Sequence, residues 1–241
     1  MAVTGLYMTT YVRRAQNAIE VFQQYAVKET LSLYSGLEER ADKIADDEFE
    51  RLGSEPAGED CDGDMSVFAE IAQEKGIAFY ETMTGLRQGI LNLLASGLFH
   101  LVEQHLADLC RDGAITIEPP ADTKLDVVAD WYKEHFGLDL RTLSAWNTLD
   151  ELRLVANTVK HGEGSSARQL RRRRPELFVH PDVARFTNLA FGTTNRPVRL
   201  PLGGDDVYVT EQLLHLYCET ASSVLGDITK HFEANADEYF G

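Results

Sequence analysis

A short stretch of the chain, residues 149–161, carries side chains that could do chemistry together. Arg153, Asn157 and His161 recur every four residues. At about 100° per residue they share one strip of a helix, and Asp150 joins them there. An imidazole can transfer protons near neutral pH, and a guanidinium can hold a phosphate. The neighbouring side of the same helix is apolar and consists of Leu149, Leu152, Val155, Ala156 and Val159. We therefore expect this strip to border a cleft or a partner.

The end of this helix is also informative, because Lys160 and His161 precede Gly162. A glycine just past a helix permits the left-handed conformation that closes it. The helix dipole favours a protonated His161 by roughly 0.3–1 kcal/mol when the side chain is exposed. Such an imidazole would act as a general acid or base. A second interpretation stays open, because Lys–His–Gly is also an ordinary way to end a helix.

A run of arginines follows, and it is the one candidate for binding phosphate in an acidic chain. The net charge is −16, which should repel bulk nucleic acid and anionic membranes. A local basic patch could still bind RNA, with contacts that weaken steeply in salt. The candidate phosphate-binding residues are Lys160, Arg168, Arg171, Arg172, Arg173 and Arg174. Alternatively, these arginines pair with the many carboxylates of the protein itself.

The composition places the chain among globular proteins. With 241 residues and 44% hydrophobic residues, we expect one domain spanning residues 1–241. Neither a signal peptide nor an apolar run long enough for a membrane span is evident. Cys61, Cys110 and Cys218 form no metal-binding pattern, and such sparse cysteines suit reduced thiols in a cytoplasm. We expect neither a metal nor another cofactor.

Helical spacing of apolar residues predicts a mostly α fold, a helical bundle. Helices are expected at 10–52, 65–112, 123–136, 141–161, 166–174 and from Thr210 onward. Residues 53–64 are interpreted as a mobile acidic loop. Gly76, Gly85 and Gly89 lower helix propensity in the second helix, which predicts a break near Thr84–Gly85. A small extended or hairpin insertion is expected before the last helix. The predicted core consists of Leu94, Leu98, Leu101, Val102, Leu152, Val155, Val159, Tyr217, Val224 and Ile228.

Two histidines of the second helix also need an interpretation. His100 and His105 are five residues apart, whereas a spacing of four aligns two metal ligands on a helix. We therefore expect them at the polar edge of the core, with Glu103 as a partner for His100.

Two segments together resemble the HEPN superfamily of helical nucleotide- and RNA-handling domains. Residues 90–110, "ILNLLASGLFHLVEQHLADLC", resemble its central helix, in which a Glu precedes a Leu. Residues 151–162, "ELRLVANTVKHG", resemble its signature helix, in which an Arg precedes a His by four to six intervening residues. The likeness covers roughly residues 65–165. It implies a helical bundle, a homodimer and often metal-independent RNA cleavage at the dimer interface, in toxin–antitoxin or antiviral systems.

Position by position, Asn157 matches the Asn of the motif and His161 its His. The arginine of the motif falls at position 156, which is Ala156 here. Arg153 lies eight residues before His161, about 12 Å along a helix, and helical side chains lean toward the N-terminus. Arg153 could therefore reach His161 only across a two-fold axis; Lys160 or the arginine run could supply the charge instead.

Two functions follow from the resemblance. The first is a homodimeric, metal-independent endoribonuclease in which His161, Arg153 and Asn157 are catalytic and Glu103 and Asp150 support them. The second is a non-catalytic module that dimerises and binds a nucleotide or a regulatory protein partner. Ala156 favours the second.

Overall fold

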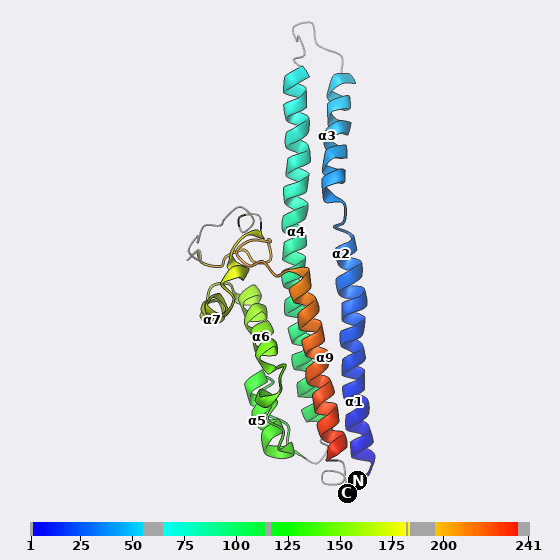
Figure 1. Cartoon of the computed structure of the whole chain (residues 1–241), viewed down its shortest axis with the longest axis vertical. Coiled ribbons are helices and arrows are strands. Elements are labelled where there is room, and N and C mark those ends of the chain that lie inside the picture. The colour runs from blue at the N-terminus through cyan, green and yellow to red at the C-terminus, as the bar shows by residue number, and fades with distance from the viewer. Residues whose placement is uncertain (1, 55–64, 114–116, 182, 184–195, 236–241) are drawn as a thin grey trace.

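The computed structural model describes residues 2–54, 65–113, 117–181, 183 and 196–235. These residues form a helical bundle, as predicted (Figure 1). The helices are α1 (Ala2–Val21), the π-helix η1 (Phe22–Glu29), α2 (Thr30–Ser32), α3 (Leu37–Ser54), α4 (Met65–Asp108), the π-helix η2 (Leu109–Gly113), α5 (Leu125–Phe136), the 3₁₀-helix η3 (Leu140–Thr142), α6 (Trp146–His161), α7 (Ser165–Arg173), the 3₁₀-helix η4 (Pro175–Phe178) and α9 (Glu211–Ala234).

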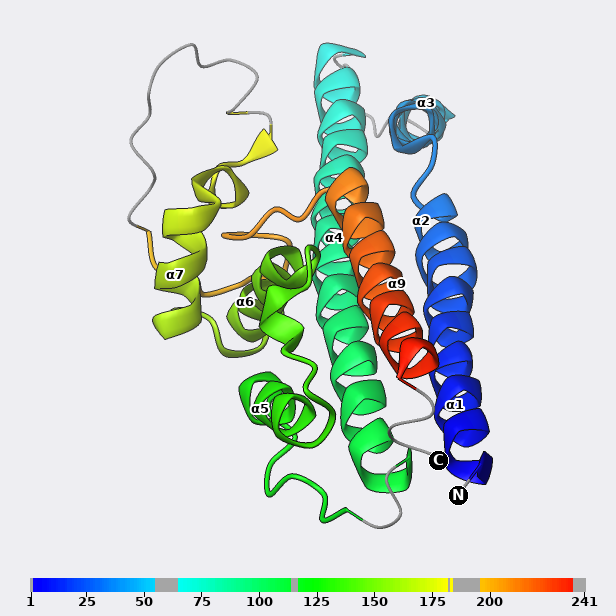
Figure 2. The ribbon, with the colours of Figure 1, turned by 60° about the horizontal axis from the view of Figure 1, so that its bottom comes forward.

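Four long helices make up the centre of the bundle. α1 packs along α9, and α4 packs along α6, while α9 also contacts both α4 and α6. α5, α6 and α7 lie on one side of α4, whereas α1 and α2 lie on the other (Figures 1 and 2). The first half of α4 extends past the centre and packs against α3, as a two-helix arm (Figure 1). None of the described helices combines the length and the apolar character that crossing a membrane requires.

The core confirms the predicted helix faces. Eight of the ten predicted residues are buried, from α4, α6 and α9: Leu98, Val102, Leu152, Val155, Val159, Tyr217, Val224 and Ile228. Leu94 and Leu101 are partly buried and pack against the same core. Burial of each large apolar side chain contributes about 1.5–3 kcal/mol. The apolar spacing of the sequence thus specifies which side of each helix faces the others.

The predicted break near Thr84–Gly85 is wrong, because α4 continues through it. Here the backbone of α4 and the backbone of residues 202–204 approach each other closely, which requires glycine. A Cβ atom built on Gly89 would lie 2.2 Å from the carbonyl oxygen of Leu202, and one on Gly204 would lie 2.1 Å from that of Gly85. Gly89 of α4 and Gly204 of the segment before α9 therefore let that segment lie directly on the helix, whereas a Cβ on Gly85 would make only an ordinary contact, 3.5 Å from the carbonyl oxygen of Gly203. The cost of glycine to helix propensity is outweighed by this packing.

That segment, residues 196–209, is the described part of the predicted insertion. No strand is assigned to it, so the predicted hairpin is not confirmed there, and residues 184–195 lie outside the described residues. The segment turns at Leu200–Gly204, where the amide of Gly203 donates to the carbonyl of Leu200. The fully buried Asn92 of α4 holds it by donating to the carbonyls of Pro201 and Val207 and accepting from the amide of Val209.

Of the predicted acidic loop at 53–64, residues 53 and 54 belong to α3, and residues 55–64 lie outside the described part of the chain.

Candidate functional site

The polar strip predicted on residues 149–161 exists and is the solvent-facing side of α6. Its members are half-buried or exposed: Asp150, Arg153, Asn157, Lys160 and His161. Every residue of α6 between Leu149 and Val159 that lies off this strip is buried. The strip is bounded by α4 on one side and by α7 on the other, because α6 packs against both. It is therefore the surface on which α6 can meet a ligand or a second chain.

Ala156, at the position of the motif arginine, faces the core and is fully buried. An arginine there would bury its guanidinium among apolar side chains, which is costly without a partner. Position 156 therefore does not belong to the exposed strip that carries Asn157 and His161.

Arg153 is held by a carboxylate of its own helix. Its Nε and Nη2 donate to Oδ1 of Asp150 at 2.8 and 2.7 Å, and Nη2 of Arg173 binds the other oxygen of Asp150 at 3.0 Å. Asp150 thus binds Arg153 of its own helix and joins α6 to α7 through the guanidinium group of Arg173. Asp150 compensates part of the charge of Arg153, and a phosphate would have to share that guanidinium with it.

Lys160 takes part in a chain of contacts that links α6 to α4. Nζ of Lys160 lies 3.0 Å from Nε2 of His100, and Nδ1 of His100 lies 3.3 Å from Oε2 of Glu103. His100 of α4 thus lies between the ammonium group of Lys160 and the carboxylate of Glu103. The predicted pairing of His100 with Glu103 is confirmed. The role of His100 beside Lys160 was missed, because the contact joins residues 60 positions apart.

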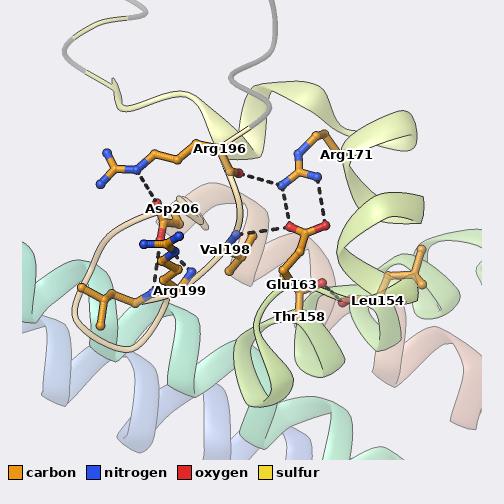
Figure 3. A network of polar contacts seen from close by, with 9 residues as sticks. Leu154, Thr158, Glu163, Arg171, Arg196, Val198, Arg199 and Asp206 are labelled. Atoms are coloured by element: carbon orange, nitrogen blue, oxygen red, sulfur yellow. Dashed lines mark hydrogen bonds and ion pairs between the residues drawn. The ribbon is translucent and has the colours of Figure 1, made fainter.

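The turn after α6 connects the end of α6 with α7 and with residues 196–209 (Figure 3). Gly162 adopts a positive φ of 67°, and a Cβ on it would lie 2.9 Å from the carbonyl oxygen of Val198. Glu163 accepts two hydrogen bonds from Arg171 of α7 and one from the amide of Val198. These bonds, those from Arg171 foremost, lower the pKa of Glu163. Gly162 and Glu163 therefore hold residues 196–209 against the end of α6.

Arg171 and Arg174 are likewise occupied within the protein. Arg171 also donates to the carbonyl of Arg196 and stacks 4.6 Å from the ring centre of Phe178. Arg174 donates to Glu151 of α6 at 2.6 Å and to Glu176, and Glu151 accepts a further bond from Tyr217 of α9. The alternative interpretation, in which the arginine run pairs with carboxylates, thus holds for Arg171, Arg173 and Arg174.

Of the site residues predicted from the sequence, Asn157 and His161 on α6 and Arg172 on α7 have no side-chain partner among the described residues. Arg168 of α7 makes no side-chain hydrogen bond there, but its charge helps to lower the pKa of Glu163. Arg172 lines a shallow concavity of about 280 Å³ with Leu154, Gln169 and Arg173. The unpaired imidazole of His161 at the end of α6 can transfer protons, and the preceding Lys160 can neutralise an anion.

Among the described residues, no group of three or more His, Cys, Asp or Glu side chains is placed to hold a metal ion. Comparison of the chain with known proteins found no matching family model, no similar curated protein and no similar solved structure.

Proposed function

We propose that this chain is a HEPN-like, metal-independent endoribonuclease. The observation that carries the proposal is the exposed end of α6, where His161, which has no side-chain partner among the described residues, directly follows Lys160, whose ammonium group lies 3.0 Å from Nε2 of His100. An acid–base group and a cation are the minimum for cleaving a phosphodiester of RNA, because its own 2′-hydroxyl supplies the nucleophile.

In the proposed reaction His161 takes the proton of the 2′-hydroxyl, and the 2′-oxygen forms a bond to the adjacent phosphorus. The bond from phosphorus to the 5′-oxygen breaks, and that oxygen takes up a proton from the protonated His161 of a second subunit. The products are a 2′,3′-cyclic phosphate and a 5′-hydroxyl, with no redox change. Lys160 stabilises the charge that develops on the phosphate oxygens, and the amide of Asn157 orients the ribose. Arg172, which is unpaired within the described residues, and Arg168, whose charge also acts on Glu163, hold neighbouring phosphates.

The proposal includes a homodimer. His161 is the one imidazole on the strip, whereas the reaction needs both a base and an acid. A two-fold axis along the strip would bring a second His161, and the Arg153 of the partner, to the same phosphate. We further propose that the protein works in the cytoplasm in a toxin–antitoxin or antiviral setting, where a regulatory protein would control it.

A second function, a non-catalytic module that dimerises and binds a nucleotide or a protein, is favoured by a separate observation. Ala156 is buried, and Arg153 is held by Asp150. The strip therefore lacks a free arginine beside His161, which leaves the stabilisation of the transition state to Lys160.

The test is incubation of the purified protein with total RNA in EDTA, followed by analysis of the fragment ends. We expect fragments with 2′,3′-cyclic phosphate ends. In His161→Ala the rate of cleavage should fall by about 10²-fold or more, the scale of general acid–base catalysis. Lys160→Gln should slow cleavage, whereas Lys43→Gln, an equal loss of charge on the exposed face of α3, should not.

Binding measurements separate the two functions. RNA bound without cleavage, and weakened by Lys160→Gln, would support the non-catalytic module. Arg172→Ala should lower the salt slope of RNA binding by about 1 without loss of stability. Arg171→Ala is unsuitable for this purpose, because it would also break the bonds to Glu163. Absence of both cleavage and binding would refute both functions.

A further inference from the structure

A second candidate site lies far along the chain from α6, where the N-terminal helices bend. The bend is the turn at residues 33–36 between α2 and α3, and Gly36 there has a positive φ of 62°. In Figure 2, α3 is seen almost end-on, whereas α1 and α2 are seen from the side, along their length. Two adjoining cavities of about 560 and 400 Å³ lie at this bend, and both are lined by Tyr34 and Arg87. Volumes of this size are typical of small-ligand sites.

The larger cavity has a cationic wall. Lys28 of η1 has no polar partner in the described part of the chain, and Arg87 of α4 uses one of its donors, on Glu211 at 3.0 Å. A guanidinium has five N–H donors, so Arg87 keeps several for a ligand. His215 lies 3.9 Å from Glu211 and 3.2 Å from Gln23 of η1. These contacts fix the wall by linking η1, α4 and α9.

The smaller cavity has an acidic and aromatic wall. It is formed by Glu38 and Glu39 in the first turn of α3 and by Tyr34 and Tyr80. None of these four side chains has a polar partner among the described residues. Carboxylates accept hydrogen bonds from an ammonium group, and the faces of tyrosine rings attract cations. Arg87 lines both cavities, so the groove has Lys28 in the larger cavity, Glu38 and Glu39 in the smaller one, and Arg87, paired with Glu211, shared between them.

We propose that this groove binds a short peptide by its two free ends. The C-terminal carboxylate would lie against Lys28 and Arg87, and the N-terminal ammonium group against Glu38 and Glu39. A single amino acid separates its two charges by one carbon atom, whereas here the charges lie in two cavities. A tripeptide extends over about 10 Å, which suits a ligand lying across both.

The charge of the lining favours a zwitterion over a polyanion such as a nucleotide. The two cavities together present the cations Lys28 and Arg87 and the carboxylates Glu38, Glu39 and Glu211, a net charge of one negative. The whole protein carries −16. A ligand with several negative charges is repelled by this lining, whereas a ligand with separated opposite charges is attracted at both ends.

The experiment is an NMR titration of the full chain with trialanine and with its end-capped forms. We expect resonances of Tyr34 and Gly36 to shift with trialanine. N-acetylation and C-amidation should each weaken binding about tenfold, because each removes a charged partner. Adenosine monophosphate serves as the anionic comparison and should bind more weakly than trialanine.

Two variants locate the ends of the peptide. Lys28→Gln should abolish the difference between the free and amidated C-terminus, and the double variant Glu38→Gln, Glu39→Gln should abolish the difference between the free and acetylated N-terminus. Lys43→Gln, an exposed charge outside the lining, should leave both differences intact. Equal binding of the doubly capped peptide, preference for adenosine monophosphate, or no shift at millimolar trialanine would each overturn the proposal.

Discussion

Asn92 is the residue on which the attachment of residues 196–209 to the bundle most depends. It is fully buried in α4, and its amide group satisfies three backbone groups of that segment: the carbonyls of Pro201 and Val207 at 2.6 and 2.8 Å and the amide of Val209 at 3.3 Å. Asn92→Leu keeps the size of the side chain and removes every one of these partners. Pro201, Val207 and Val209 are themselves buried, so water cannot readily replace the lost bonds.

The magnitude follows from these three groups. A buried backbone group left without a partner costs about 1–3 kcal/mol, so three cost at least about 3 kcal/mol. Local detachment of the segment limits the upper end, because a detached segment regains its bonds to water. For a domain of this length, a loss of about 3 kcal/mol lowers Tm by roughly 6–12 °C.

The assay is urea and thermal unfolding of the variant beside Asn157→Leu, a matched change on the exposed strip of α6. Asn157 has no side-chain partner in the described part of the chain, so its replacement should change stability by less than about 0.5 kcal/mol. Hydrogen exchange should in addition show faster exchange of the amide of Val209 in Asn92→Leu. Equal stability of the two variants, or unchanged exchange at Val209, would refute the reasoning.

Three further predictions concern α3, α4 and α6. Gly89→Ala should lower the melting temperature, because the added Cβ would lie 2.2 Å from the carbonyl oxygen of Leu202. Gly53→Ala is the control: a Cβ there would have no atom within 4 Å, so a thermal melt should show unchanged or slightly higher stability. Ala156→Arg should cost about 3–5 kcal/mol by burying an unpaired guanidinium, while Asn157→Arg on the exposed strip should be tolerated; similar melting temperatures for the pair would contradict the burial of position 156. Hydrogen bonds from Arg51 and Lys75 lower the pKa of Glu48 from 4.5 to about 2, so Glu48 stabilises the fold above pH 4.5 and loses this contribution as the pH falls toward 2. Glu48→Gln should therefore reduce the acid sensitivity of unfolding, whereas Glu50→Gln on the same helix should reduce it less.

The sequence by itself determined the helical class and the side of each helix that faces the core. It did so because the spacing of apolar residues is a local property: Leu98 and Val102, or Leu152 and Val155, share a face in any α-helix. The same local geometry placed Arg153, Asn157 and His161 on one strip. Eight of the ten predicted core residues are buried for this reason, and the strip lies on the side of α6 that is not buried.

Only the tertiary structure decided what these residues contact. Gly85 and Gly89 looked like helix breakers, and they became contact points because residues 202–204 lie against them. The arginine run looked like one basic patch, but Arg171, Arg173 and Arg174 are paired with carboxylates, whereas Arg168 and Arg172 make no side-chain hydrogen bond in the described residues. His100 meets Lys160 across 60 residues. Such partners are set by how helices pack against one another, and packing depends on the whole chain, whereas the period of a helix depends on a few neighbouring residues.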